Sequence, residues 1–231
     1  RWSLSGGREE TLKIMANEDS RGELIDGINE IIDQGIGPEA VLIARYVPDE
    51  SLEGKNLAEI SDLMRIPPAE TVLSMYEKGE AMVIEYSMDE NDVDKFAKHH
   101  LIAVASDGSS VSKEGILSVG KPHPRSYGTN PRFIQKYVNE KKLVSIQEAV
   151  RKMTSMPAQR IGLTNRGRLI PGYAADIVIM DLPNVEEKST FVDPHQYPKG
   201  ITHVIVNGEI VIKDEEYTGK TPGVMITDFN S

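Results

Sequence analysis

The sequence predicts an α/β fold, and three features of its apolar pattern support that prediction. Residues 81–86 and 101–105 are apolar almost throughout, which is typical of strands buried on both faces of a parallel sheet. Residues 88–100, between them, have helical character, and parallel strands need such a crossover. From residue 167 onward short strands alternate with turns, which predicts a small antiparallel β unit after a boundary near residues 160–167.

The residues before this strand–helix–strand unit predict mainly helices. Apolar residues recur at helical spacing over residues 8–34 and the pattern is interrupted near residues 19–22, so we expect two helices there. The short apolar run over residues 40–46 predicts a strand. Residues 56–64 and 67–78 predict two further helices, the second with prolines in its first turn.

Beyond the second buried strand we expect a long loop and then two helices. Residues 108–131 are rich in glycine, serine and proline, and loops of this length are usually functional or disordered. Residues 131–140 and 145–154 predict the helices. Within the β unit, Asn207–Gly208 is the strongest hairpin signal of the chain.

Composition and charge exclude several classes of function. Lys+Arg at 26 against Asp+Glu at 36 gives a formal net charge of −10, so we expect no nucleic-acid partner. The apolar runs fall far short of the roughly 20 residues of a membrane-spanning helix, so we expect no integral membrane segment. The absence of cysteine fits a cytoplasmic protein. Because the first residue is Arg and no secretory signal follows, we expect a fragment or a processed product.

Two charged residues are candidates for chemistry. Asp107 follows the end of a predicted buried strand, the position at which α/β sheets bind ligands; the alternative is that Asp107 and Gly108 form a simple turn. Arg125, in the long loop, could bind a substrate carboxylate through two parallel hydrogen bonds, or could tie the loop with a salt bridge. Met88 and Tyr86, after the first buried strand, could line an apolar pocket or pack the core.

The histidines do not form a metal-binding motif. His99 and His100 are adjacent, so they point in different directions, and we expect structural roles for His195 and His203. His123 lies between two prolines, which could aim its side chain or only stiffen the loop. Because no His-x-His or His-Glu-x-x-His pattern occurs, the chain alone cannot complete a zinc site of three or four protein ligands.

A series of short motifs falls in order along the sequence, among them Ser106-Asp-Gly108, His123-Pro-Arg125-Ser-Tyr-Gly-Thr129, Ala149-Val-Arg-Lys-Met-Thr-Ser155, Arg166-Gly-Arg-Leu169, Ala175-Asp176, Pro194-His-Gln-Tyr197 and His203-Val-Ile-Val-Asn-Gly208. Together they resemble the C-terminal part of the N-acyl-D-amino-acid deacylases, or D-aminoacylases, of the amidohydrolase superfamily. The match is dense from residue 106 to residue 224 and weaker before it.

The resemblance implies a metal-dependent (β/α)₈ TIM barrel hydrolase joined to a small β-sandwich or β-barrel domain. On that basis residues 1–80 are a mostly helical insertion, residues 81–160 are the last part of the barrel, and residues 161–231 are the C-terminal part of the β domain. The resemblance further implies that the full-length enzyme uses zinc to hydrolyse the amide bond of N-acyl-D-amino acids. Asp107 would approach the metal and transfer protons, Arg125 would bind the substrate carboxylate, and Met88 would line the acyl pocket.

The family's metal-binding histidines belong upstream of this sequence, in the missing N-terminal half of the barrel. We therefore expect truncation, a chain that alone has no zinc site and hydrolyses nothing, and apolar surface exposed where barrel strands are absent. Two alternatives remain. One is a related amidohydrolase for cyclic amides, such as a dihydroorotase or hydantoinase. The other is a non-catalytic protein or one subunit of a split enzyme.

Overall fold

The computed structural model describes residues 6–34 and 37–227, and the chain divides into two compact units. Residues 1–87 together with residues 114–123 form the first, which we call the helical unit. Residues 88–113 together with residues 124–231 form the second, which we call the β unit. No helix in the described part of the chain is long and apolar enough to cross a membrane.

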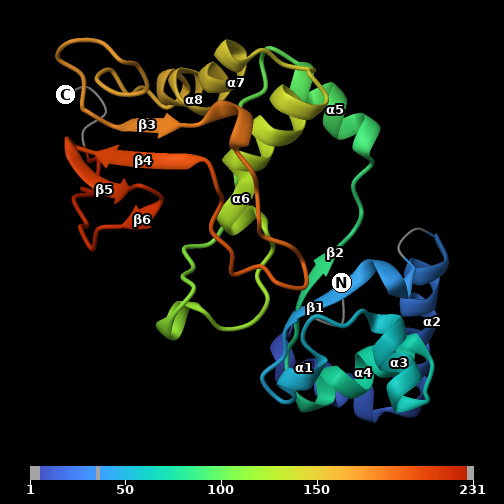
Figure 1. Ribbon diagram of the computed structural model, residues 1–231. Helices are drawn as coiled ribbons and strands as arrows, with labels where there is room; N and C mark the ends of the chain where they lie inside the picture. The colour runs from blue at the N-terminus through green and yellow to red at the C-terminus, as the bar shows by residue number, and fades with distance from the viewer. Residues whose placement is uncertain (1–5, 35–36, 228–231) are drawn as a thin grey trace. The chain divides into compact units, whose positions relative to one another are not determined.

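The helical unit is built from helices and a two-stranded antiparallel sheet (Figure 1). Its helices are α1 (Gly7–Ala16), α2 (Glu18–Gln34), α3 (Leu57–Met64) and α4 (Pro68–Lys78), with short 3₁₀ turns η2 (Pro38–Ala40), η3 (Glu50–Leu52) and η4 (Gly115–Leu117). The strands are β1 (Val41–Arg45) and β2 (Met82–Glu85). The break between the first two helices lies at Asn17, earlier than predicted, because the Asn17 side chain accepts a hydrogen bond from the Ser20 amide and starts the second helix.

Local sequence signals explain where α3 begins and what it packs against. The amide of Glu59 donates to the Asn56 side chain at 2.9 Å, and the amide of Asn56 donates to the Glu59 carboxylate at 2.8 Å, which forms a capping box. The apolar face of α3 buries Ile60 against Ile43 and Tyr46, the core of this unit. The Tyr46 hydroxyl donates to a backbone carbonyl at 2.8 Å, so this buried polar group is satisfied.

The second segment of the helical unit, residues 114–123, is fixed to β1 through backbone contacts. The amide of Lys121 donates to the carbonyl of Ala44 at 2.6 Å. Gly120 has φ +74°, and a Cβ atom there would lie 3.0 Å from the Ala44 oxygen, so only glycine fits this close approach.

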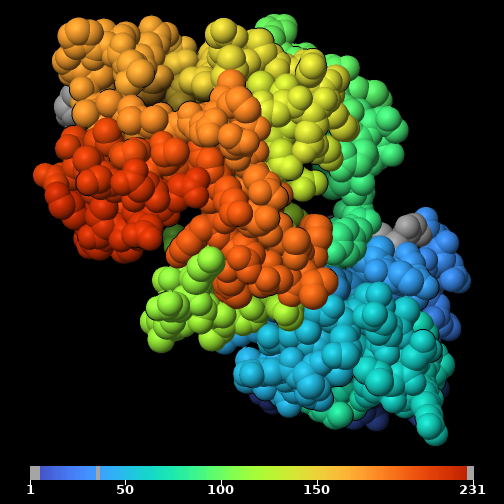
Figure 2. Space-filling model, viewed as in Figure 1, coloured from blue at the N-terminus to red at the C-terminus, as the bar shows by residue number. Residues whose placement is uncertain are grey.

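The β unit combines a set of helices with a four-stranded antiparallel sheet (Figure 1). Its helices are α5 (Glu90–Lys98), α6 (Arg125–Arg132), the π-helix η5 (Phe133–Glu140), α7 (Ile146–Met153) and α8 (Ser155–Arg160), with a 3₁₀ turn η6 (Leu182–Asn184). The strands, in the order in which they pair, are β3 (Ile177–Met180), β4 (Ile201–Val206), β5 (Glu209–Lys213) and β6 (Glu216–Tyr217). In the space-filling view, β4 to β6 (red) form one continuous block (Figure 2).

The predicted hairpin at Asn207–Gly208 is confirmed. These residues join β4 to β5, with Val206 opposite Glu209. Their φ angles are +49° and +83°, the left-handed values that a two-residue hairpin turn requires. The helical core of the unit lies elsewhere, around Phe133, Tyr137 and Ala149.

The chain mixes helices and sheets as an α/β fragment does, but the predicted parallel strand pair is wrong for the described residues. β2 pairs antiparallel with β1, and residues 101–105 are not a strand. A strand needs a neighbouring strand that pairs with its backbone amides and carbonyls. In this segment the backbone groups instead bond to Lys152 of α7. Lys152, 1% exposed, donates from Nζ to the carbonyls of His99 and, at 2.8 Å, Ile102; its own carbonyl accepts from the Val104 amide at 3.1 Å.

Candidate functional site

The structure brings the two predicted charged residues of the β unit into direct contact. Nη2 of Arg125 lies 2.7 Å from Oδ2 of Asp107. The Asp107 side chain is 86% exposed and that of Arg125 is 43% exposed. The contact is the loop-tying salt bridge that the sequence left open as an alternative for Arg125, and both charged groups remain reachable from solvent.

The backbone around Asp107 is held in an unusual conformation. Asp107 has φ +46°, a left-handed value uncommon for residues other than glycine, asparagine and aspartate. The side chain of Ser106 accepts from the amide of Gly108 at 3.2 Å, and that of Ser126 accepts from the amide of Ser109 at 3.2 Å. A Cβ atom on Gly108 would lie 3.0 Å from Cα of Ser126, so glycine allows this loop to approach α6 closely.

Arg125 lies on a helix rather than in the long loop predicted for residues 108–131, so that part of the prediction is wrong. Pro124 precedes the helix with φ −50°, and a proline at a helix start fixes a helical φ and leaves no amide unsatisfied. The hydroxyl of Thr129 donates back to the Arg125 carbonyl at 2.9 Å. The guanidinium is thus anchored to the first turn of a regular element.

An aromatic cluster adjoins this turn, and sequence reasoning missed most of it. The hydroxyl of Tyr127 and Nδ1 of His195 share a hydrogen bond of 2.8 Å. The Tyr127 ring meets the Tyr197 ring edge to face, with centroids 5.7 Å apart, and Nζ of Lys113 lies 4.8 Å from the centre of the Tyr197 ring. Burial, and secondarily the neighbouring Tyr197, raises the pKa of the Tyr127 hydroxyl. The sequence signals for this cluster were the motif that follows Arg125, which contains Tyr127, and the motif Pro194-His-Gln-Tyr197.

Met88 lies at the surface of the β unit, just before α5. It is 74% exposed and directly precedes α5, whose N-cap Asp89 accepts from the amides of Asn91 and Asp92 at 2.9 and 3.2 Å. Tyr86 is also substantially exposed and lies in the helical unit. Their role as pocket residues remains a prediction.

Within residues 6–34 and 37–227, the side chains do not form a metal site by themselves. Among the residues that the structure describes, no three histidine, cysteine, aspartate or glutamate side chains are grouped so that they could hold a metal ion. Asp107 offers one carboxylate, whereas zinc in proteins takes three or four protein ligands. His99 and His100 stack on one another with ring centroids 5.1 Å apart.

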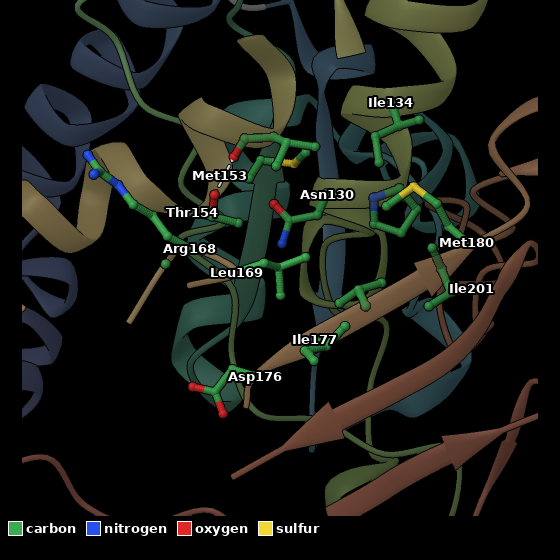
Figure 3. Close-up of a pocket in the computed structure, with 14 residues that line it drawn as sticks. Asn130, Ile134, Met153, Thr154, Arg168, Leu169, Asp176, Ile177, Met180 and Ile201 are labelled. Atoms are coloured by element: carbon green, nitrogen blue, oxygen red, sulfur yellow. Dashed lines mark hydrogen bonds between the residues drawn. The ribbon is translucent and has the colours of Figure 1, made fainter. Parts of the chain in front are cut away.

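The β unit also contains an apolar cavity of about 390 Å³ (Figure 3). It is lined from α6, η5, α7 and β3, mainly by the apolar side chains of Ile134, Met153, Leu169 and Ile177. Two of its polar side chains have partners: Thr154 donates to a backbone carbonyl at 2.7 Å, and Asp176 forms an ion pair with Arg166. Asn130 and Arg168 also line the cavity, which is therefore mainly apolar with a few polar groups in its wall.

The exposed surface next to this cavity is unusually apolar. Leu169 is 78% exposed, and Val178 and Ile179 of the edge strand β3 are 51% and 49% exposed. An edge strand with large exposed apolar side chains is typical of a surface that another polypeptide covers.

Comparison with known proteins places the chain beside a set of hydrolases. Residues 115–212 match the model of the amidohydrolase family. The chain is 35% identical over 168 residues to an N-acyl-D-glutamate deacylase of Alcaligenes xylosoxydans xylosoxydans, an alignment that covers 73% of this chain and 32% of the relative. The chain thus spans about a third of the length of the curated relatives it matches.

Solved structures match most of this chain, those of a D-aminoacylase and of an N-acyl-D-glutamate deacylase among them. The crystal structure of a D-aminoacylase matches with a TM-score of 0.68 and 34% identity, over 78% of this chain and 36% of that one. An N-acyl-D-glutamate deacylase from Bordetella bronchiseptica, complexed with zinc and a phosphonate mimic of the tetrahedral intermediate, matches with a TM-score of 0.67 and 31% identity, over 76% of this chain and 35% of that one.

Proposed function

We propose a function from one premise: the chain is homologous to part of the N-acyl-D-amino-acid deacylases and carries, over residues 115–212, a segment of the amidohydrolase family. The protein to which it belongs hydrolyses the amide bond of N-acyl-D-amino acids, giving a carboxylate and a free D-amino acid. The structural observation that supports this proposal is the contact between Asp107 and Arg125, because a carboxylate of the kind that can transfer protons lies beside a cation of the kind that can bind a carboxylate.

Asp107 is the proposed catalytic residue. Amide hydrolysis adds a water oxygen to the carbonyl carbon and breaks the C–N bond, so one proton must leave the water and one must reach the leaving nitrogen. An exposed carboxylate can accept the first proton and deliver it to the nitrogen. Asp107 is also the one metal ligand that we assign to this chain; the zinc of the whole enzyme needs further ligands from outside the described residues.

Arg125 is the proposed binding residue for the α-carboxylate of the substrate. Its planar guanidinium can form two parallel hydrogen bonds with a carboxylate. Because Arg125 pairs with Asp107 in this structure, a bound substrate carboxylate competes with Asp107 for the same cation. Substrate binding would then weaken the ion pair between Arg125 and Asp107 and make the Asp107 carboxylate available for proton transfer.

The remaining parts of the proposal concern the pocket, the partners and the compartment. Met88 lines the pocket for the acyl group, which its exposed thioether side chain suits. The ligand is a small molecule, and the partner surface is the rest of the barrel, which covers the apolar face next to β3. The enzyme is cytoplasmic, in keeping with a chain that has no cysteine.

The decisive experiment uses the full-length protein and its Asp107→Asn variant. We expect release of free D-amino acid from N-acetyl-D-amino acids by the wild type, no release from the L-enantiomers or from hydantoins, and loss of turnover in the variant. Asp107 is 86% exposed, so the substitution leaves the fold intact, which circular dichroism checks. Full turnover by the variant would refute the assigned role, and hydantoin hydrolysis would favour a cyclic-amide enzyme.

A further inference from the structure

The first turn of α6 makes three different contacts from three consecutive residues. Arg125 pairs with Asp107 at 2.7 Å, Ser126 accepts a hydrogen bond from the amide of Ser109 at 3.2 Å, and the hydroxyl of Tyr127 shares a hydrogen bond of 2.8 Å with Nδ1 of His195. The turn that carries the candidate binding residue is therefore held from separate directions.

These side-chain contacts act at the start of α6, whereas its far end continues into η5 and is anchored in the core. Its N-cap is Pro124, whose side chain makes no capping hydrogen bond. The only residue of α6 that is buried is Gly128, so the helix has almost no apolar anchor. Pro131 interrupts the helix, which continues as the π-helix η5. The buried residues Phe133 and Tyr137 of η5 anchor the far end of the helix, and the side-chain contacts of the first turn fix its near end.

The partner of Tyr127 belongs to a well-fixed loop. Pro194, next to His195, is fully buried, and its carbonyl accepts from the Ser189 hydroxyl at 2.6 Å. The Tyr127 ring meets the His195 ring edge to face, with centroids 5.7 Å apart and an angle of 82° between the planes. The imidazole is thus a rigid point to which the tyrosine hydroxyl can attach.

We propose that the hydrogen bond between Tyr127 and His195 fixes the first turn of α6 and so aims the Arg125 guanidinium at the substrate carboxylate. Tyr127 and His195 are positioning residues that act through Arg125. The catalytic part of this inference rests on the proposed function, whereas the structural part does not.

The test uses Tyr127→Phe in the full-length enzyme, because this change removes one oxygen and keeps the ring contacts. We expect KM for N-acetyl-D-amino acids to rise about 3- to 10-fold with kcat nearly unchanged, since loss of one hydrogen bond weakens a contact made equally in the ground and transition states. With the α-carboxamide of the same substrate, which offers Arg125 no charge, kcat/KM should be the same in variant and wild type.

Tyr217→Phe is the matched control, because the Tyr217 hydroxyl also donates a hydrogen bond, to a carbonyl in the turn after β6 at 3.2 Å. It should leave KM unchanged for both substrates. An equal loss on carboxylate and carboxamide for Tyr127→Phe, or an unchanged KM on both, would overturn the proposal, because the tyrosine would then not act through the arginine.

A readout without catalysis separates this inference from the proposed function. If the wild type does not hydrolyse N-acyl-D-amino acids, the proposed function fails, and crystal structures of the full-length wild type and Tyr127→Phe still test the positioning. We expect the guanidinium of Arg125 to lose its single orientation in the variant. Retention of the contact with Asp107 at 2.7 Å would overturn the inference.

Discussion

Lys152 offers a quantitative test of how the segment before the candidate site is held. Its ammonium group, on a side chain that is 1% exposed, donates to the carbonyls of His99 and Ile102, while its own carbonyl accepts from the amide of Val104. Burial lowers the pKa of Lys152, and Glu148 only partly opposes this. Asp107 follows Val104 by three positions, so this lysine fixes the approach to the site.

Lys152→Met keeps the length and apolar volume of the side chain and removes the donor. Each hydrogen bond from a charged group contributes about 1.5 to 3 kcal/mol to stability. Part of the lost stability is offset in the variant, because the folded protein no longer has to desolvate an ammonium group. We therefore expect a net loss of about 2 to 4 kcal/mol in the free energy of unfolding of the β unit.

The assay is amide hydrogen exchange at Val104 together with urea unfolding. We expect the Val104 amide to exchange faster in Lys152→Met and the urea midpoint to fall. Lys95→Met is the control, because Lys95 is 75% exposed and pairs only with a surface aspartate. Equal exchange rates and equal midpoints for wild type and Lys152→Met would refute the reasoning that this lysine replaces a neighbouring strand.

Four further predictions concern binding, backbone strain, pH and metal. Arg125→Ala should lower kcat/KM of the full-length enzyme about 10- to 150-fold, from the 1.5 to 3 kcal/mol of a charged hydrogen bond; an unchanged value would contradict carboxylate binding. Gly120→Ala should destabilise the helical unit more than Gly115→Ala, since both have φ near +75° but only Gly120 has a carbonyl 3.0 Å from the new Cβ; equal urea midpoints would refute this. Burial raises the pKa of Glu187 in the folded protein, although Arg132 opposes this. Glu187 therefore contributes to stability below its unfolded pKa of about 4.3, and this contribution is lost as pH rises through the folded pKa. Glu187→Gln should thus gain stability over wild type as pH rises from about 4 to 8, and a pH-independent difference in urea midpoint would count against it. The 231-residue chain alone should bind no stoichiometric zinc and release no D-amino acid, which metal analysis and an assay on the same sample check.

Elements with strong local signals could be predicted from the sequence. The helix after Asn56 and the hairpin at Asn207–Gly208 form where expected, because a capping box and a left-handed turn depend on residues a few positions apart. The prediction of a strand over residues 101–105 is wrong for the opposite reason. Their apolar run shows that they suit a buried strand, but pairing depends on a neighbour that no local pattern can supply.

The same distinction holds for the candidate site. Asp107 and Arg125 were identified from the sequence, and the structure brings them together. The sequence left open a salt bridge that ties the loop through Arg125, and the structure forms one. Its partner, Asp107, could not be foreseen, because the conformation of the long loop between the two residues decides it. Tyr127 was missed as a positioning residue because its partner His195 is 68 positions away, a separation over which residue spacing carries no information.

The path of the chain through the two units has a consequence for dissection of this protein. The chain leaves the helical unit after residue 87, returns to it at residue 114 and leaves it again after residue 123, so it crosses three times. No single cut can therefore separate the units. A deletion of everything before residue 88 would remove β1, whose Ala44 carbonyl accepts the hydrogen bond from the Lys121 amide, and would leave residues 114–123 unsupported. The piece left without support is the covalent link between Asp107 and Arg125. Any shortened version of the protein must therefore replace that link with a designed loop rather than simply remove the helices.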